Sequence, residues 1–232
     1  MKSSIAIIAG VLTCASIGAY ATETTVEDTG NTVDYVQVRN GVAYQVNETT
    51  PFTGRLTRKY DTGQNALQVK FANGKAVGSE TTWYPNGQVA SSINYREGVA
   101  TGEWKQWYDN GQLKTDSHYQ NGKRSGHYTE WAYNGQKVVD ANYDKGKLQG
   151  QVSTWYENGQ PRTEATYDGG QKDGPAIQYY SNGNKAYQAN YEDGAINNGT
   201  ITQYSMDGQK AYEVTVKNNK VVSEQHWFDG KS

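Results

Sequence analysis

Three histidines, His118, His127 and His226, carry the most versatile side chains of this chain, because imidazole acts near neutral pH as a base, an acid or a metal ligand. Two histidines on strands of one sheet would be able to share a metal ion, but no Asp or Glu constellation at metal-ligand spacing accompanies these. His118 also falls in a column of polar residues that recurs along the chain. We therefore expect solvent-facing histidines, no metal and no cofactor.

Carboxylates are the next candidates for chemistry, because a pair in contrasting environments performs general acid-base catalysis. Asp116, Asp140, Glu164 and Glu213 recur at one position of a repeat, so they indicate architecture and not a unique pair. The serines lack a Gly-x-Ser-x-Gly motif, and the glycines of 169–174 belong to turns, not to a phosphate loop. Asp-Gly-rich turns would suit calcium, but a period of 24 residues fits neither nonapeptide calcium repeats nor an EF-hand. We expect a protein that is not an enzyme.

Aromatic side chains are the strongest candidates for binding. One column recurs beside the turns and consists of Trp83, Trp107, Trp131, Trp155, Tyr179 and Tyr204. We interpret it as a structural ladder; the alternative is a shallow groove for a protein segment or a carbohydrate. Trp104 and Tyr128 break the pattern at another position. The other units carry Glu80, Val152, Ala176 and Ile201 there. Because a ligand-specific site is expected where repeats differ, we predict binding at Trp104, Trp107, Tyr128 and Trp131.

The elements that carry these side chains come from an internal repeat. Gly111, in the motif Trp-Tyr-Asp-Asn-Gly-Gln, recurs at a spacing of 24 residues five times and then 25. The glycines of this column are Gly63, Gly87, Gly111, Gly135, Gly159, Gly183 and Gly208. Two further glycine columns keep nearly the same step, which identifies a repeat array.

Each unit predicts a β-hairpin. An aromatic pair such as Trp107-Tyr108 favours a strand, and the Asn-Gly pair that follows, as in Asn110-Gly111, favours a type I′ turn. The return segment alternates with period two, as in 185–191, which is typical of a strand. A second turn, such as 121–123, leads to the next unit. We therefore predict an all-β repeat array of antiparallel β-hairpins that forms an elongated twisted sheet.

The first 21 residues predict a secretory signal peptide. Met1–Ala21 has a short positive start, a mostly apolar stretch from Ile5 to Ile17, and a small-x-small cleavage site at its end. Cys14, the single cysteine, offers an alternative as the lipid-modified first residue of a lipoprotein, although the residues before it match such a site poorly. We expect cleavage after Ala21, a mature chain without cysteine, and a periplasmic or secreted protein.

The remaining chain divides into four segments. Residues 22–34 are polar and predict a flexible leader, 35–53 an irregular N-terminal capping hairpin, 54–217 the repeats, and 218–232 a C-terminal capping strand. Acidic and basic residues are interspersed and the formal net charge is −2, so no basic surface for nucleic acid is expected. The oligomeric state stays open, because an uncapped edge strand would pair two chains.

From about residue 35 to the end, the unit Gly-x-x-x-x-Trp-Tyr-x-Asn-Gly-Gln resembles the MORN repeats, and in particular the bacterial MORN-variant repeats of proteins commonly labelled antitoxins. The resemblance implies a non-enzymatic scaffold or binding module, and the antitoxin label implies neutralising a partner protein by binding it. The export signal departs from a cytoplasmic antitoxin and favours an immunity-type protein that occludes a toxin or effector in the envelope. The alternative is a structural envelope or cell-surface scaffold whose aromatic groove meets glycan or lipid.

Overall fold

The structure is a computed structural model that describes residues 30–227. The predicted signal peptide, 1–21, lies outside the described residues. Two compact units make up the described chain: the first holds 30–102 and 120–122, and the second holds 103–119 and 123–227. Both consist of β-strands joined by turns, which confirms the predicted all-β class and the repeated antiparallel hairpins. Among the described residues, no helix is long and apolar enough to cross a bilayer.

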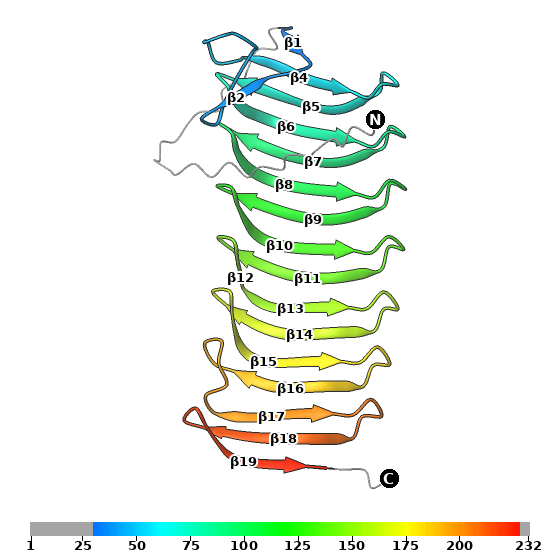
Figure 1. The fold of residues 1–232 in the computed structure, drawn as a ribbon, viewed down its shortest axis with the longest axis vertical. Helices are drawn as coiled ribbons and strands as arrows, with labels where there is room; N and C mark the ends of the chain where they lie inside the picture. Colours follow the sequence, from blue (N-terminus) through cyan, green and yellow to red (C-terminus); the bar gives the residue numbers. More distant parts are fainter. Residues whose placement is uncertain (1–29, 228–232) are drawn as a thin grey trace. The chain divides into compact units, whose positions relative to one another are not determined.

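The first unit contains the N-terminal strands and the first repeats. Its strands are β1 (Thr32–Val33), β2 (Gln37–Arg39), β3 (Val42–Tyr44), β4 (Gly54–Lys59), β5 (Asn65–Ala72), β6 (Lys75–Trp83), β7 (Val89–Arg96) and the start of β8 (Val99–Trp107). From β4 to β7 each strand pairs antiparallel with the next (Figure 1). β2 and β3 form a two-stranded hairpin of their own.

A hydrophobic cluster joins this N-terminal hairpin to the first repeat. The cluster consists of Val36, Ala43, Phe52, Leu56 and Val69. β1 pairs parallel with β4, and its Val33 packs against the cluster. Residues 22–29 of the predicted flexible leader lie outside the described residues; at its end, partial burial of Val33 and the pairing with β4 stabilise the short strand β1.

The second unit contains the later repeats. Its strands, after the end of β8, are β9 (Leu113–Gln120), β10 (Lys123–Trp131), β11 (Lys137–Asp144), β12 (Lys147–Leu148), β13 (Gly150–Trp155), β14 (Pro161–Asp168), β15 (Gln171–Tyr179), β16 (Lys185–Tyr191), β17 (Gly199–Tyr204), β18 (Lys210–Lys217) and β19 (Lys220–His226). From β13 to β19 each strand pairs antiparallel with the next, and β11 pairs with β10, β12 and β13. Hairpins such as β10–β11 and β13–β14 carry the same one-residue register shift beside the loop.

Each repeat has two turns, and the type I′ geometry occurs in the other turn from the one predicted. In the short turns between hairpins both central residues have positive φ, for example 50° at Asn121 and 74° at Gly122, as a type I′ turn requires. In the Asn-Gly loops Gly159 has a φ of 84°, but Asn158 has no positive φ. The prediction of type I′ turns at these Asn-Gly pairs is therefore wrong.

The side chain of the loop asparagine explains its recurrence. Asn158 Oδ1 accepts a hydrogen bond from the Gln160 N–H at 3.0 Å, and its Nδ2 donates to the Ser181 carbonyl at 3.0 Å. The first bond shapes the loop, and the second connects it to the loop of the next hairpin. Asparagine thus stabilises contacts between neighbouring units through its amide.

A second set of contacts, the tyrosine ladder, also connects consecutive hairpins. The ladder consists of Tyr60, Tyr108, Tyr156 and Tyr180. Their hydroxyls donate at 2.6–2.8 Å to the backbone carbonyls of Trp83, Trp131, Tyr179 and Tyr204. Each acceptor belongs to the next hairpin, so the aromatic column contributes backbone acceptors to these contacts.

Candidate functional site

The sheet of the second unit has two faces of different character, because successive side chains of a strand point to opposite faces. Tyr128 lies opposite Ala141, and Thr129 lies opposite Asp140. We call the first of these the alanine face, since Ala141, 1% exposed, and Ala165 belong to its buried central column. The other is the acidic face, which carries the repeated carboxylate column.

The alanine face carries a cluster of rings that we call the aromatic patch. It consists of Trp104 on β8, Tyr119 on β9, Arg124 and Tyr128 on β10, and Tyr143 on β11. Trp104 meets Tyr119 edge to face, with ring centroids 5.4 Å apart. Tyr128 and Tyr143 are arranged in the same way at 5.9 Å. Such edge-to-face pairs add to the stabilisation that burial alone provides.

Arg124 joins the two ring pairs. Its guanidinium lies 4.7 Å from the Tyr128 ring centroid, 5.6 Å from that of Tyr143 and 5.8 Å from that of Trp104. All three distances fall within the range of a cation–π contact. Arg124 Nε also donates to Tyr119 Oη at 3.3 Å. The half-buried patch therefore holds one fixed positive charge among four aromatic rings.

Glu130 adds a negative charge at the border of the patch. Tyr128 Oη donates to Glu130 Oε2 at 2.9 Å. Burial, followed by this hydrogen bond, raises the pKa of Tyr128 to about 12. Tyr128 therefore stays a neutral phenol at physiological pH, and the patch combines apolar rings with charges of both signs.

The structure brings together two of the four predicted binding residues. Trp104 and Tyr128 meet around Arg124, whereas Trp107 and Trp131 belong to the acidic face. Trp107 lies three residues after Trp104 in β8, and an odd spacing reverses the face. Glu130 pairs with Val139 of β11 and therefore lies on the alanine face, so the next residue, Trp131, lies on the acidic face. The four residues therefore do not form one continuous patch.

Three residues of the patch are absent from the prediction. Tyr119 and Tyr143 belong to the recurrent tyrosine column, so nothing local distinguishes them. Arg124 stands 24 residues from Ala100 and from Leu148. Since Lys172 occupies the same column one unit further on, a basic residue at this position does not by itself identify Arg124.

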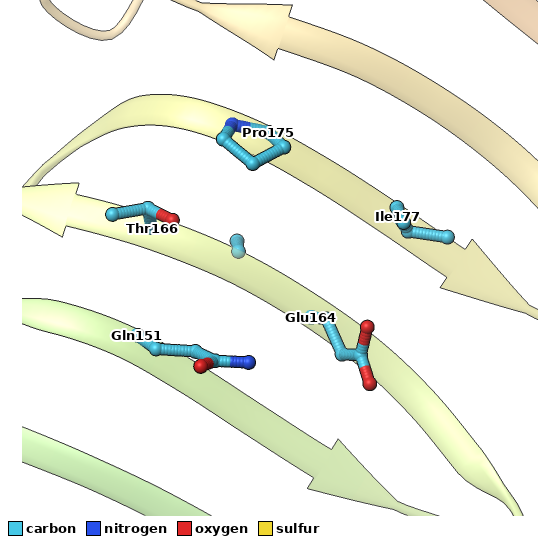
Figure 2. Close-up of a pocket in the computed structure, with 6 residues that line it drawn as sticks. Gln151, Glu164, Thr166, Pro175 and Ile177 are labelled. Atoms are coloured by element: carbon cyan, nitrogen blue, oxygen red, sulfur yellow. The ribbon is translucent and has the colours of Figure 1, made fainter.

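On the acidic face the structure forms a small hollow of about 80 Å³. Its lining residues are Gln151, Glu164, Ala165, Thr166, Pro175 and Ile177. Figure 2 shows five of these side chains on three neighbouring strands. Tyr179 Oη donates to Glu164 Oε2 at 3.1 Å, so this carboxylate is engaged by the protein. The hollow is smaller than ordinary ligand sites, which measure about 300–1,000 Å³.

His127 makes polar contacts on the same face, whereas His226 on β19 pairs with Tyr212 of β18 and lies with its Nε2 3.4 Å from Glu224 Oε1. His127 Nε2 lies 3.5 Å from Asp140 Oδ1, and its Nδ1 lies 3.3 Å from Asn142 Oδ1. His118 is exposed. Within residues 30–227, no group of three or more His, Cys, Asp or Glu side chains is arranged to hold a metal ion.

Comparison with protein families identifies the repeat. The family model described as MORN repeat variant matches residues 76–97, 100–121, 148–168 and 172–193. Each matched segment contains one outgoing and one returning strand, and the hairpin β10–β11 lies between the second and third segments. The chain thus carries repeats of the MORN-variant type at four places, which supports the predicted MORN-variant repeat family. MORN repeats often mediate binding to proteins or lipids. A search of curated proteins gave no match.

Proposed function

We propose that this chain is an exported, non-enzymatic binding protein of the antitoxin or immunity type, which occludes a toxin or effector protein with its alanine face. The aromatic patch carries this proposal. Trp, Tyr and Arg dominate the residues that contribute most to protein–protein affinity, and the patch assembles four aromatic side chains around one arginine.

The patch is also local to two hairpins. Trp104 and Tyr128 occupy a repeat position at which the flanking units carry Glu80 and Val152. A side chain needed only for the repeat architecture would recur in the other units. Two adjacent large aromatics that are local to these hairpins, joined by an arginine, therefore support recognition of a partner.

Export is the second part of the proposal. Its support is the sequence of Met1–Ala21, with its apolar stretch and its cleavage motif. An exported binder would meet its target in the periplasm or outside the cell. An immunity protein against a toxin that acts in the envelope fits that location and the resemblance to proteins labelled antitoxins.

The test combines partner recovery with a protection assay. The mature chain, tagged and crosslinked in its native cells, is purified beside a Trp104→Ala/Tyr128→Ala variant and a Trp107→Ala control that removes a ring from the acidic face. We expect one stoichiometric protein with wild type and control, and its loss with the double variant. Deletion of the gene is expected to sensitise cells to a toxin encoded beside it. Recovery of only abundant envelope proteins, glycan or lipid, with an envelope defect on deletion, would favour the scaffold function.

A further inference from the structure

A cavity of about 430 Å³ opens on the second unit beside the loops of the hairpins β10–β11 and β13–β14. Its volume falls within the range of about 300–1,000 Å³ typical of ligand sites. The residues that line it are Tyr108, Glu130, Trp131, Ala132, Val138, Val139, Thr154, Trp155, Tyr156, Glu157 and Arg162. Glu130 Oε2 also accepts the hydrogen bond that Tyr128 Oη donates, so the cavity borders the aromatic patch.

The cavity coincides with a break in the tyrosine ladder. Tyr108 and Tyr156 donate to the carbonyls of Trp131 and Tyr179. Midway between these two tyrosines, 24 residues from each, the chain carries Ala132. Alanine has neither a ring nor a hydroxyl. Among the described residues, no tyrosine hydroxyl donates to the Trp155 carbonyl, 24 residues after that of Trp131, in the way that the carbonyls of Trp83, Trp131, Tyr179 and Tyr204 are reached.

The neighbouring Tyr133 does not replace the missing rung. Its ring packs edge to face on Tyr108, with centroids 5.1 Å apart. A hydrogen bond to Asp109, followed by burial, raises the pKa of Tyr133. Its side chain is 56% exposed and does not line the cavity. The space beside Ala132 thus stays available to a group from outside the chain.

The walls of the cavity define the group that fits. Tyr108, Trp131, Trp155 and Tyr156 supply aromatic residues, and Val138 and Val139 supply aliphatic side chains. A ring with one hydroxyl would pack against these walls and donate to the Trp155 carbonyl, as Tyr108 does to Trp131. A phosphorylated ring is disfavoured, because the lining carries two carboxylates, of Glu130 and Glu157, against the single guanidinium of Arg162.

We infer that this cavity binds a tyrosine side chain of the partner protein, whose phenol takes the place of the missing rung. The inference rests on the proposed function for the identity of the partner. The phenol site itself follows from the ladder geometry and is tested without that partner. Glu130 and Val139 connect the cavity to the alanine face, so the aromatic patch and the cavity are neighbours, with Glu130 at their border.

The experiment titrates the isotope-labelled mature chain with N-acetyl-L-tyrosinamide and records NMR signals of the Trp131 and Trp155 indoles. N-acetyl-L-phenylalaninamide, which lacks the hydroxyl, is the matched ligand. Ala132→Tyr restores the rung, and Ser181→Tyr adds a tyrosine to an exposed loop position outside the cavity. We expect saturable shifts with the tyrosine probe for wild type and Ser181→Tyr. Binding is expected to weaken about two- to tenfold with the phenylalanine probe, since one hydrogen bond is lost, and to disappear in Ala132→Tyr, since the cavity itself is filled.

Equal binding of the two probes, an Ala132→Tyr variant that binds like wild type, or no saturable shift would overturn the inference. The converse variant Tyr180→Ala opens a second gap opposite the Tyr204 carbonyl, and we expect it to gain a second site for the tyrosine probe. If Ala132→Tyr blocks the probe but no protein partner is recovered, the phenol site stands and the proposed function fails. If the partner binds Ala132→Tyr as tightly as wild type, the inference fails and the proposed function stands.

Discussion

Removal of one ladder hydroxyl tests whether the tyrosine ladder holds consecutive repeats together. Tyr156 Oη donates to the Tyr179 carbonyl at 2.8 Å from a half-buried position. Tyr156→Phe keeps the ring and deletes only the donor. A neutral hydrogen bond of this kind contributes about 0.5–1.5 kcal/mol to the free energy of unfolding. For a chain of this size, a loss of about 1 kcal/mol lowers the Tm by roughly 2–4 °C.

The matched control is Tyr167→Phe. Tyr167 is also half-buried in the second unit, but its hydroxyl has no hydrogen-bond partner among the described residues. We expect removal of the Tyr167 hydroxyl to change the free energy of unfolding by less than about 0.5 kcal/mol. Urea unfolding followed by circular dichroism gives the stabilities. Hydrogen exchange of the backbone amides then shows which strands lose protection in the variant, since arrays of repeats open locally. Equal stabilities of the two variants would refute the role of the ladder.

Three further predictions concern single side chains. Ser117 Oγ is buried without a hydrogen-bond partner, so Ser117→Ala is expected to raise the free energy of unfolding by about 1 kcal/mol; a urea titration in which the variant is less stable would contradict this. Burial raises the pKa of Glu80 above 4.5, so the folded state favours the neutral acid and loses stability as the pH rises through that raised pKa. Glu80→Gln is therefore expected to exceed wild type in Tm at pH 7, with an advantage that disappears below about pH 4.5; a constant difference across this range would exclude the burial effect. Glu130→Gln is expected to lower the pKa of Tyr128 from about 12 while leaving it above 10, because the burial of the ring remains. An unchanged pKa in an ultraviolet titration would show that the hydrogen bond to Glu130 does not raise the pKa of Tyr128.

The repeat architecture was predictable because periodic signals in the sequence agree with one another. Glycine columns set the unit length, and alternation with period two sets the strands. Both signals are local, so they identify hairpins without knowledge of tertiary contacts. Residues 54–217, predicted as the repeats, begin with β4 and end with β18.

The turn geometry was less predictable, because the same dipeptide has two roles. Asn121-Gly122 adopts positive φ at both residues. Asn158-Gly159 does not, since its loop is longer and closes through the Tyr156 N–H and the Gln160 carbonyl, 2.9 Å apart. The amide of Asn158 then bonds to the neighbouring hairpin. Loop length and contacts between units, which a dipeptide does not encode, decide the conformation.

The candidate site was predictable only in part for a similar reason. Departure from the repeat identified Trp104 and Tyr128, which the structure brings together. Ala132 also departs from the repeat, and the same rule would have identified the gap in the tyrosine ladder. A small residue in place of a large one indicates a cavity only when the residues that surround it in space are known. Arg124 gains its significance from rings on three other strands. Such combinations depend on how strands pair.

Site-specific photocrosslinking in native cells tests most directly that the alanine face binds a partner protein. A photoreactive amino acid replaces one of two residues. Gln106 lies two residues after Trp104 in β8 and therefore on the same alanine face, whereas the exposed His118 lies on the acidic face of the next strand, β9. We expect one dominant protein crosslink from position 106, lost in the Trp104→Ala/Tyr128→Ala background, and little from position 118. A dominant crosslink from position 118 that survives the double substitution would contradict this expectation.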